Sequence, residues 1–351
     1  MTSVRPLPET RTTRPVEGRS LGTKAAGLLA LLVALGIAVI ASLAIGARGI
    51  PPLEVLQVLF GADTTSQNAL VILDQRIPRT LIGLVAGAAL GVAGGLIQAV
   101  TRNPLADPGI LGVNAGAAFA LALGTGLVGV RGPLGTLLLA FAGAFVASVL
   151  VYLIGSLGRG GGSPVRLILA GVALGAVLAG ITRAIVLTDR ERFAVMTSWE
   201  SGSLLDRDPG LLTWAGPLVL VGIIIALAIS SSLNAVALGD DLASALGANV
   251  FRTRVFAVAA VMLLAGSATA LAGPIAFVGL MVPHIVRWIV GPDQRWILSY
   301  SALAAPTLLV LADVVGRVVI PPGELPAGIV TALIGAPVLI GLVRTRKASE
   351  L

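Results

Sequence analysis

The chain has 351 residues, of which 56% are hydrophobic and only 12% are charged, and its formal net charge is +7. A soluble domain carries roughly a quarter charged residues because it needs a wet surface, so this composition excludes an ordinary soluble protein. The positive charge does not indicate nucleic acid as a partner, because no basic cluster is interleaved with aromatic residues. Cysteine is absent, which excludes disulfides and thiolate metal sites.

Long apolar runs place the chain in a bilayer. A helix needs about 20 apolar residues to cross the hydrocarbon core. Five runs of at least this length contain no Asp, Glu, Lys or Arg: Ala25–Ala47, Thr80–Thr101, Pro108–Val130, Gly132–Gly158 and Pro209–Gly239. None alternates in polarity as the strands of a membrane barrel do. We therefore predict an all-α polytopic membrane protein.

The predicted elements begin with a basic tail at 1–24, which is rich in proline and arginine and is expected to be disordered. The apolar run that follows is too long for the core of a cleavable signal peptide. A membrane domain of ten helices is expected over 25–343, and a short tail at 344–351 ends the chain. The ten spans are predicted at about 25–47, 80–101, 108–126, 133–157, 165–186, 211–231, 254–271, 276–290, 296–315 and 326–343.

The distribution of basic residues predicts the orientation. Ten spans place both termini on one side of the membrane. On that side we count fifteen of the 24 Lys and Arg residues, which by the positive-inside rule makes it the cytoplasmic side. The other nine are outer arginines: Arg48, Arg76, Arg79, Arg131, Arg183, Arg190, Arg192, Arg207 and Arg317.

Glycine recurs every fourth residue in the second span, at Gly83, Gly87, Gly91 and Gly95. Such a smooth stripe on one helix face lets a second backbone approach closely. It predicts tight helix packing, although glycine is also frequent throughout this chain.

The chain lacks its own source of energy. Both lysines, Lys24 and Lys347, are followed by Ala, so no nucleotide-binding P-loop is present. Only His284 and Asp313 are candidates for titratable groups inside the spans. His284 follows a proline and is interpreted as structural, and Asp313 is expected to pair with Arg317 four residues later. We expect no catalytic site, no cofactor and no metal site.

Several stretches resemble the FecCD family of ABC importer permeases, the type II group that includes the vitamin B12 permease. The most specific is the run NPLADPGILG at 103–112. Others lie at 76–98, 169–174, 237–247, 273–287 and 324–328. The residues that we assign to the structural motif of the family are Asn103, Pro104, Gly273, Pro274, Pro283 and His284.

The resemblance implies the type II permease fold with ten helices per subunit. It also implies two cytoplasmic ATPase subunits, an extracytoplasmic substrate-binding protein and a second permease subunit, identical or homologous, in a bacterial inner membrane. The expected substrate is a metal chelate, with a ferric siderophore preferred and cobalamin or haem as alternatives. Two other classes stay open: a secondary transporter without an ATPase, and a membrane scaffold or receptor that transports nothing.

The resemblance also assigns three sites. Arginines on the outer face of similar permeases receive glutamates of the binding protein, and the matching residues are Arg76, Arg79 and Arg317. The alternative is that these arginines are snorkelling anchors at helix ends.

The loop 232–253 resembles the coupling region that contacts the ATPase, through residues Asp240, Asp241, Leu242, Ala243 and Leu246. Asp240 could instead be a plain helix N-cap. The loop 158–165 corresponds to the cytoplasmic gate, with Ser163, Pro164 and Val165 at the constriction. A flexible glycine-rich turn without a gating function is the alternative there.

Overall fold

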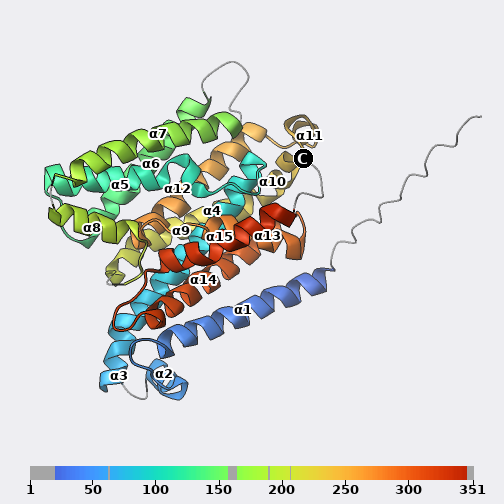
Figure 1. Cartoon of the computed structure of the whole chain (residues 1–351). Helices are drawn as coiled ribbons and strands as arrows, with labels where there is room; N and C mark the ends of the chain where they lie inside the picture. Colours follow the sequence, from blue (N-terminus) through green and yellow to red (C-terminus); the bar gives the residue numbers. More distant parts are fainter. Residues whose placement is uncertain (1–19, 62–63, 157–163, 189, 206, 346–351) are drawn as a thin grey trace, which may run out of the picture.

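The computed structural model describes residues 20–61, 64–156, 164–188, 190–205 and 207–345. Within these ranges the regular structure is helical throughout (Figure 1). The helices are α1 (Leu21–Ala44), α2 (Pro52–Leu59), α3 (Gln67–Leu70), the π-helix η1 (Val71–Arg76), α4 (Ile77–Thr101), the short 3₁₀ turn η2 (Pro108–Leu111), α5 (Val113–Leu123), the π-helix η3 (Gly124–Val128), α6 (Pro133–Ser156), α7 (Pro164–Val186), α8 (Arg190–Glu200), the 3₁₀ turn η4 (Pro209–Leu211), α9 (Leu212–Ala228), α10 (Ser230–Ala237), α11 (Asp240–Ala245), α12 (Val250–Ala272), α13 (Val278–Val290), α14 (Gln294–Val319) and α15 (Ala327–Thr345).

The predicted membrane architecture is confirmed. Within the described part of the chain, seven helical segments are long and apolar enough to cross a bilayer. Three shorter apolar helices, Val113–Gly126, Val278–Val290 and Ala327–Gly341, complete the set. In chain order these segments coincide with the ten predicted spans. The break predicted between the seventh and eighth spans is also found, because α12 ends at Ala272 and Gly273 follows with a φ of +76°.

The boundaries differ most at the first two spans. Disorder is expected up to residue 24, but residues 21–24 are helical because α1 begins at Leu21. The Ser20 side chain caps this helix and accepts a hydrogen bond from the Thr23 N–H at 3.3 Å. Residues 1–19 lie outside the described part. The second span begins at Gln67 rather than at 80. It includes Arg76 and Arg79, whose side chains bind main-chain carbonyls and carboxylates nearby.

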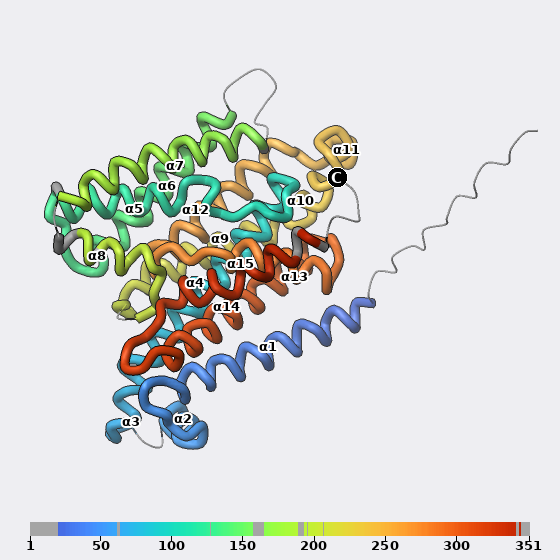
Figure 2. Tube along the Cα trace, viewed as in Figure 1, coloured from blue at the N-terminus to red at the C-terminus, as the bar shows by residue number. Residues whose placement is uncertain are grey.

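Helix α4 runs through the middle of the bundle and packs mainly against α14 and α12 (Figure 2). The glycine stripe faces α14. A Cβ added at Gly87 would lie 2.4 Å from the Cα atom of Pro306, and one at Gly91 would lie 2.5 Å from the Ser301 carbonyl oxygen. Tight packing along this stripe is confirmed, with backbone in direct contact with backbone.

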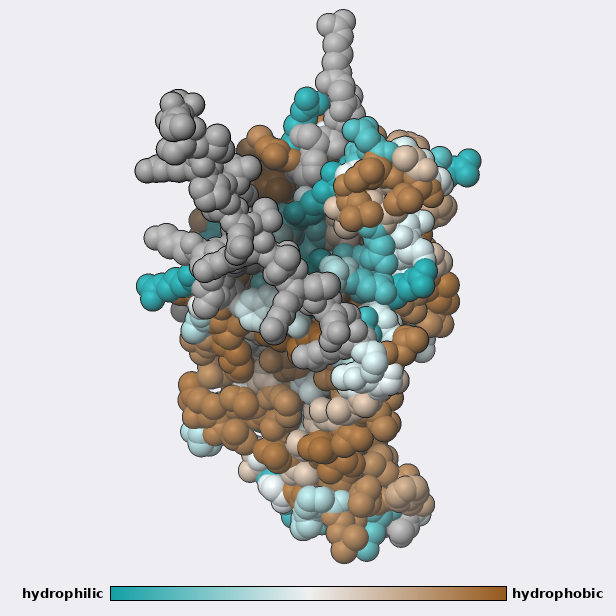
Figure 3. All heavy atoms as spheres, turned by 90° about the vertical axis from the view of Figure 1, so that its right-hand side faces the viewer, coloured by the Kyte–Doolittle hydropathy of each residue, from teal (hydrophilic) through white to brown (hydrophobic). Residues whose placement is uncertain are grey.

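The two ends of the bundle carry different elements (Figure 1). The start of α1, the end of α15 and the short helices α10 and α11 lie at one end, which we call the α10–α11 end. Helices α2 and α3, the start of α4 and the turn between α14 and α15 lie at the other, the α2–α3 end. Viewed from the α10–α11 end, hydrophilic residues gather on the upper part of the face and hydrophobic residues dominate below it (Figure 3). This division fits a protein whose flanks meet lipid and whose ends meet water.

Replacing Gly87 by Ala tests the α4–α14 contact. The new methyl group would overlap the Pro306 backbone, which cannot move aside as a flexible side chain can, so we expect a loss of about 1–3 kcal/mol in unfolding free energy. Gly36→Ala on α1 is the matched control, because no atom lies within 4 Å of its added Cβ and an extra methyl favours the helix. Thermal unfolding in detergent measures both. Equal midpoints for the two variants would contradict the contact.

Candidate functional site

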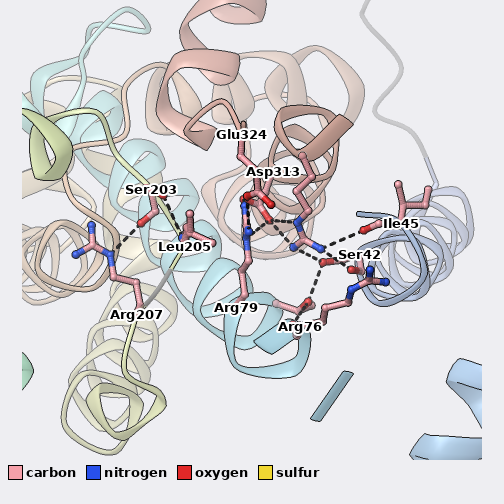
Figure 4. Close-up of polar contacts among 11 residues, drawn as sticks. Ser42, Ile45, Arg76, Arg79, Ser203, Leu205, Arg207, Asp313 and Glu324 are labelled. Atoms are coloured by element: carbon pink, nitrogen blue, oxygen red, sulfur yellow. Dashed lines mark hydrogen bonds and ion pairs between the residues drawn. The ribbon is translucent and has the colours of Figure 1, made fainter. Parts of the chain in front are cut away.

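A buried carboxylate lies at the centre of the α2–α3 end. Asp313 of α14 accepts hydrogen bonds from Arg79 of α4, from Nε at 2.9 Å and from Nη2 at 2.8 Å (Figure 4). Nη1 of the same guanidinium donates to Glu324 Oε2 at 2.7 Å. Arg79 therefore joins α4, α14 and the turn that precedes α15 in one bidentate and one single ion pair. Arginine suits this arrangement because its planar fork matches carboxylates.

Arg317 completes the cluster from one turn further along α14. Its Nε donates to Asp313 Oδ2 at 3.0 Å, which confirms the predicted pair between positions four residues apart. The Asp313 and Arg317 side chains are only 2% and 3% exposed. Charges at this depth are stable only when they are paired and hydrogen-bonded. One carboxylate between two guanidinium groups satisfies both conditions.

Two of the predicted docking arginines also bind the end of α1. Arg317 Nη1 donates to the Ser42 carbonyl at 2.6 Å, and Arg76 Nη1 donates to the Leu43 carbonyl at 2.6 Å. Arg76 Nη2 donates to the Arg48 carbonyl as well. The last carbonyls of a helix have no partner within it and attract cations. Arg76 and Arg317 therefore fasten the end of α1 to the bundle.

A pocket of about 380 Å³ opens beside this cluster, and five arginines and two acids line it. Its charged lining residues are Arg48, Arg76, Arg79, Arg207, Arg317, Asp74 and Glu324. With Asp313 beneath it counted as a third acid, five positive charges face three negative ones, so a positive surplus of two remains. The pocket is suited to bind a carboxylate that enters from the α2–α3 end.

Two arginines outside the predicted docking set also line the pocket. They are Arg48 and Arg207, and both belong to the nine arginines that the sequence predicts to lie on the outer side. Arg207 donates from Nε to the Ser203 carbonyl at 3.0 Å and points away from Asp313 (Figure 4). Arg48 is exposed and donates to Gln67 Oε1 at 3.0 Å. Of the three predicted arginines, Arg76 and Arg317 are buried.

The predicted coupling loop is formed by the two short helices α10 and α11. Asp241, Leu242 and Leu246 are exposed, whereas Ala243 is buried in the segment. Gly239 occupies the N-cap position of α11 with a φ of +116°, and Asp240 is the first helical residue. The alternative interpretation of Asp240 as an N-cap is therefore wrong. Its carboxylate binds arginines instead.

The predicted gate lies mostly beyond what the structure describes. Ser163 falls outside the described residues. Pro164 is the first residue of α7, and the side chain of Val165 is exposed. The gate stays a prediction.

The family motif forms a buried junction near the α10–α11 end. His284 of α13 is buried, its Nδ1 lies 3.3 Å from the Pro104 carbonyl oxygen, and its ring packs edge-on against Trp288. Asn103 Oδ1 accepts from the Leu105 N–H at 3.0 Å. Burial raises the pKa of the Asp107 carboxyl, and a hydrogen bond from the Gly109 N–H opposes this rise. These contacts agree with a structural interpretation of His284.

Among the described residues, no group of three or more His, Cys, Asp or Glu side chains lies close enough to hold a metal ion. The ionic chemistry of this part of the chain is that of arginine–carboxylate pairs.

The family model of the FecCD transport family matches residues 32–345. The chain belongs to the FecCD transport family. It is 50% identical over 324 residues to the ferric enterobactin transport system permease protein FepD of Escherichia coli (strain K12), and the match covers 92% of this chain and 96% of FepD. It is 38% identical to the probable siderophore transport system permease protein YfiZ of Bacillus subtilis (strain 168), over 90% of this chain and 95% of that protein.

A solved structure supports the same assignment. A metal-chelate type ABC transporter in an inward-facing conformation matches with a TM-score of 0.79 and 29% sequence identity. The alignment covers 92% of this chain and 99% of that one. The type II permease fold predicted from the sequence is thereby confirmed.

Replacing Asp313 by Asn tests the central carboxylate. The substitution preserves shape but leaves the two guanidinium groups without their shared counter-charge, so we expect a loss of about 3–5 kcal/mol in unfolding free energy. Glu324→Gln is the matched control. Its side chain is 24% exposed, and its pair with Arg79 should contribute no more than about 1 kcal/mol. Unfolding curves in detergent distinguish the two. Similar losses for both variants would show that Asp313 does not hold the cluster.

Proposed function

We propose that this chain is the membrane-spanning permease subunit of an ATP-driven importer that carries a ferric siderophore into the cytoplasm. The observation that carries the proposal is the 50% identity, over 92% of this chain, to a ferric enterobactin permease. The alternatives within the same class are a cobalamin or a haem importer. A bacterial inner membrane is the proposed location, with both termini in the cytoplasm, which makes the α10–α11 end the cytoplasmic one.

The pocket at the α2–α3 end is the proposed docking site for an extracytoplasmic substrate-binding protein. Glutamate or aspartate side chains of that protein would enter the pocket and pair with its arginines. Arg76 and Arg317 are buried and Arg48 is exposed, so a docking carboxylate would meet Arg48 before it reached them. Arg207 also lines the pocket and would add its charge there. Glu324 is the outermost acid of the cluster and occupies Arg79 Nη1. It therefore competes with a docking carboxylate for the same donor.

Helices α10 and α11 are the proposed contact for the cytoplasmic ATPase. Leu242 and Leu246 expose large apolar side chains at an end of the molecule that meets water. Exposed apolar residues rimmed by polar ones mark protein interfaces. Asp241 lies beside them and would pair with basic residues of the ATPase.

A second permease subunit, identical or homologous, would complete the membrane part. Helix α7 exposes Leu169, Val172 and Val177 along its length and packs only against one side of the bundle. Substrate would pass between the two subunits by alternating access, driven by partners that bind the two conformations with different affinity. The permease itself would form and break no covalent bond, and its proposed role is non-enzymatic.

Reconstitution of the permease with its ATPase and binding protein in liposomes tests this function. We expect uptake of a labelled ferric siderophore that requires both partners and ATP hydrolysis, because the chain has no nucleotide-binding loop of its own. Ferric siderophore, cobalamin and haem are compared at equal concentration. Uptake that continues without ATP would identify a secondary transporter, and absence of any uptake with all partners present would favour the scaffold or receptor alternative.

Charge reversal at the rim of the pocket tests docking without disturbing the buried cluster. Arg48→Glu combined with Arg207→Glu should lower the association rate of the binding protein and weaken the salt dependence of that rate, because rim charges steer encounter. Arg131→Glu is the matched control, since Arg131 is an exposed outer arginine that does not line the pocket. Surface plasmon resonance on the detergent-solubilised permease measures the rates.

Glu324→Gln should act in the opposite direction in the same assay. The amide oxygen of Gln can still accept from Arg79 Nη1 but carries no net charge, so a docking carboxylate displaces it more easily and we expect the affinity for the binding protein to rise by up to about fivefold. A fall in affinity would show that Glu324 contacts the partner's cations instead.

A further inference from the structure

Arg102 has an unusual backbone conformation at the end of α4. It follows the last helical residue, Thr101, with φ +51° and ψ +28°, in the left-handed region that side-chain-bearing residues rarely adopt. Such a conformation persists where surrounding contacts hold it. Here Arg102 Nε donates to the Val236 carbonyl of α10 at 2.9 Å, and Nη2 donates to Asp240 of α11. Because of this turn, the Arg102 side chain reaches α10 and α11, which form the predicted coupling loop (called the coupling segment from here on).

A second arginine binds the same carboxylate from another helix. Arg254, in the second turn of α12, donates from Nη2 to both Asp240 oxygens at 3.0 Å. The Asp240 side chain is 46% exposed and the two arginines are 35% and 23% exposed. Ion pairs this exposed contribute little to stability. Their geometric effect is larger, because one carboxylate fixes the start of α11 to both α4 and α12.

Helix α10 is fastened to α14 by separate contacts. Asn234 Nδ2 donates to Asp293 Oδ1 at 2.7 Å, and Asn234 Oδ1 accepts from the Gln294 N–H at 2.8 Å. Arg295 Nε donates to Ser231 Oγ at 3.1 Å. The first turn of α14 thus holds α10 through side chains on both elements.

The helices that hold the coupling segment also form the docking end. At their other ends, α4 carries Arg79 and α14 carries Asp313 and Arg317. Between the ends they touch through Gly87 and Pro306. One packed pair of helices therefore has a polar cluster at each end.

From this arrangement we infer that Arg102 and Arg254 are positioning residues, which hold α11 through Asp240 so that docking at the α2–α3 end changes the ATPase contact at the α10–α11 end. The inference rests on the proposed function and deepens it. It reassigns Asp240 from a direct ATPase contact to an internal link. Asp241, Leu242 and Leu246 are left to make the contact.

Linkage between the two partners provides the test. If docking and nucleotide binding are coupled, the affinity for the binding protein differs between complexes with and without a non-hydrolysable ATP analogue. This ratio of dissociation constants is measured in the assembled permease–ATPase complex in nanodiscs. Arg102→Ala and Arg254→Ala should each bring the ratio closer to one by roughly 2-fold to 30-fold, the range seen for mutations that alter coupling. The affinity without nucleotide should stay unchanged.

Three variants separate positioning from general damage. Arg252→Ala removes the same charge from the start of α12 without touching Asp240, and it should keep the wild-type ratio. Arg254→Lys retains a donor for Asp240, so its ratio of dissociation constants should stay close to the wild-type ratio. The charge swap Asp240→Arg with Arg254→Asp should have a ratio closer to the wild-type ratio than that of either single variant.

Two results would overturn the inference: a wild-type ratio in both alanine variants, or an equal loss in the Arg252→Ala control. Failure of the charge swap, with a normal ratio in Arg254→Lys, would show that Asp240 contacts the ATPase directly and would also contradict it. These outcomes differ from failure of the proposed function, in which the wild-type complex itself shows neither ATP-driven uptake nor any ratio other than one.

Discussion

The placement of one carboxylate, Asp313, constrains the whole α2–α3 end. A charged group away from water is tolerated only beside opposite charge and hydrogen-bond donors, and Asp313 receives both from Arg79 and Arg317. Those two arginines come from different helices, and Arg317 also binds the end of α1. Three helices therefore meet at one charge. These contacts fix how α1, α4 and α14 are rotated about their own axes. They also fix the position of the arginine-lined pocket beside the cluster.

The sequence predicted the features that depend on local spacing. Apolar run length located the spans, because a helix satisfies its backbone hydrogen bonds internally and needs about 20 apolar residues to cross the bilayer. Four-residue spacing predicted both the glycine stripe and the pair of Asp313 with Arg317. A break at Gly273 followed from the conformational preferences of glycine and proline. The family motifs predicted the permease fold, which is confirmed, and a coupling function for the loop 232–253, which stays a prediction; the structure shows that this loop forms the short helices α10 and α11.

Contacts between distant segments could not be predicted in this way. Arg79 and Asp313 are 234 residues apart. Nothing in the sequence around either residue indicates that α4 and α14 contact each other at these two positions. Asp240 looked like a helix cap because its local sequence permits one, and its arginine partners come from two other helices. For Arg48 and Arg207 the sequence offered one usable signal, their predicted position on the outer side. The sequence did not show which outer arginines converge on one pocket.

The contact between Gly87 and Pro306 limits how this protein can change shape. Where side chains separate two helices, rotamer changes let the helices slide or roll. Here the backbone of Gly87 lies directly against Pro306 with no room for a side chain between them, so we expect α4 and α14 to resist motion relative to each other. We therefore expect α4 and α14 to move together as one rigid unit. Among the described helices, α7 is far less buried than α4 or α14, so we expect opening and closing of a path through the membrane to displace α7 rather than to separate this pair.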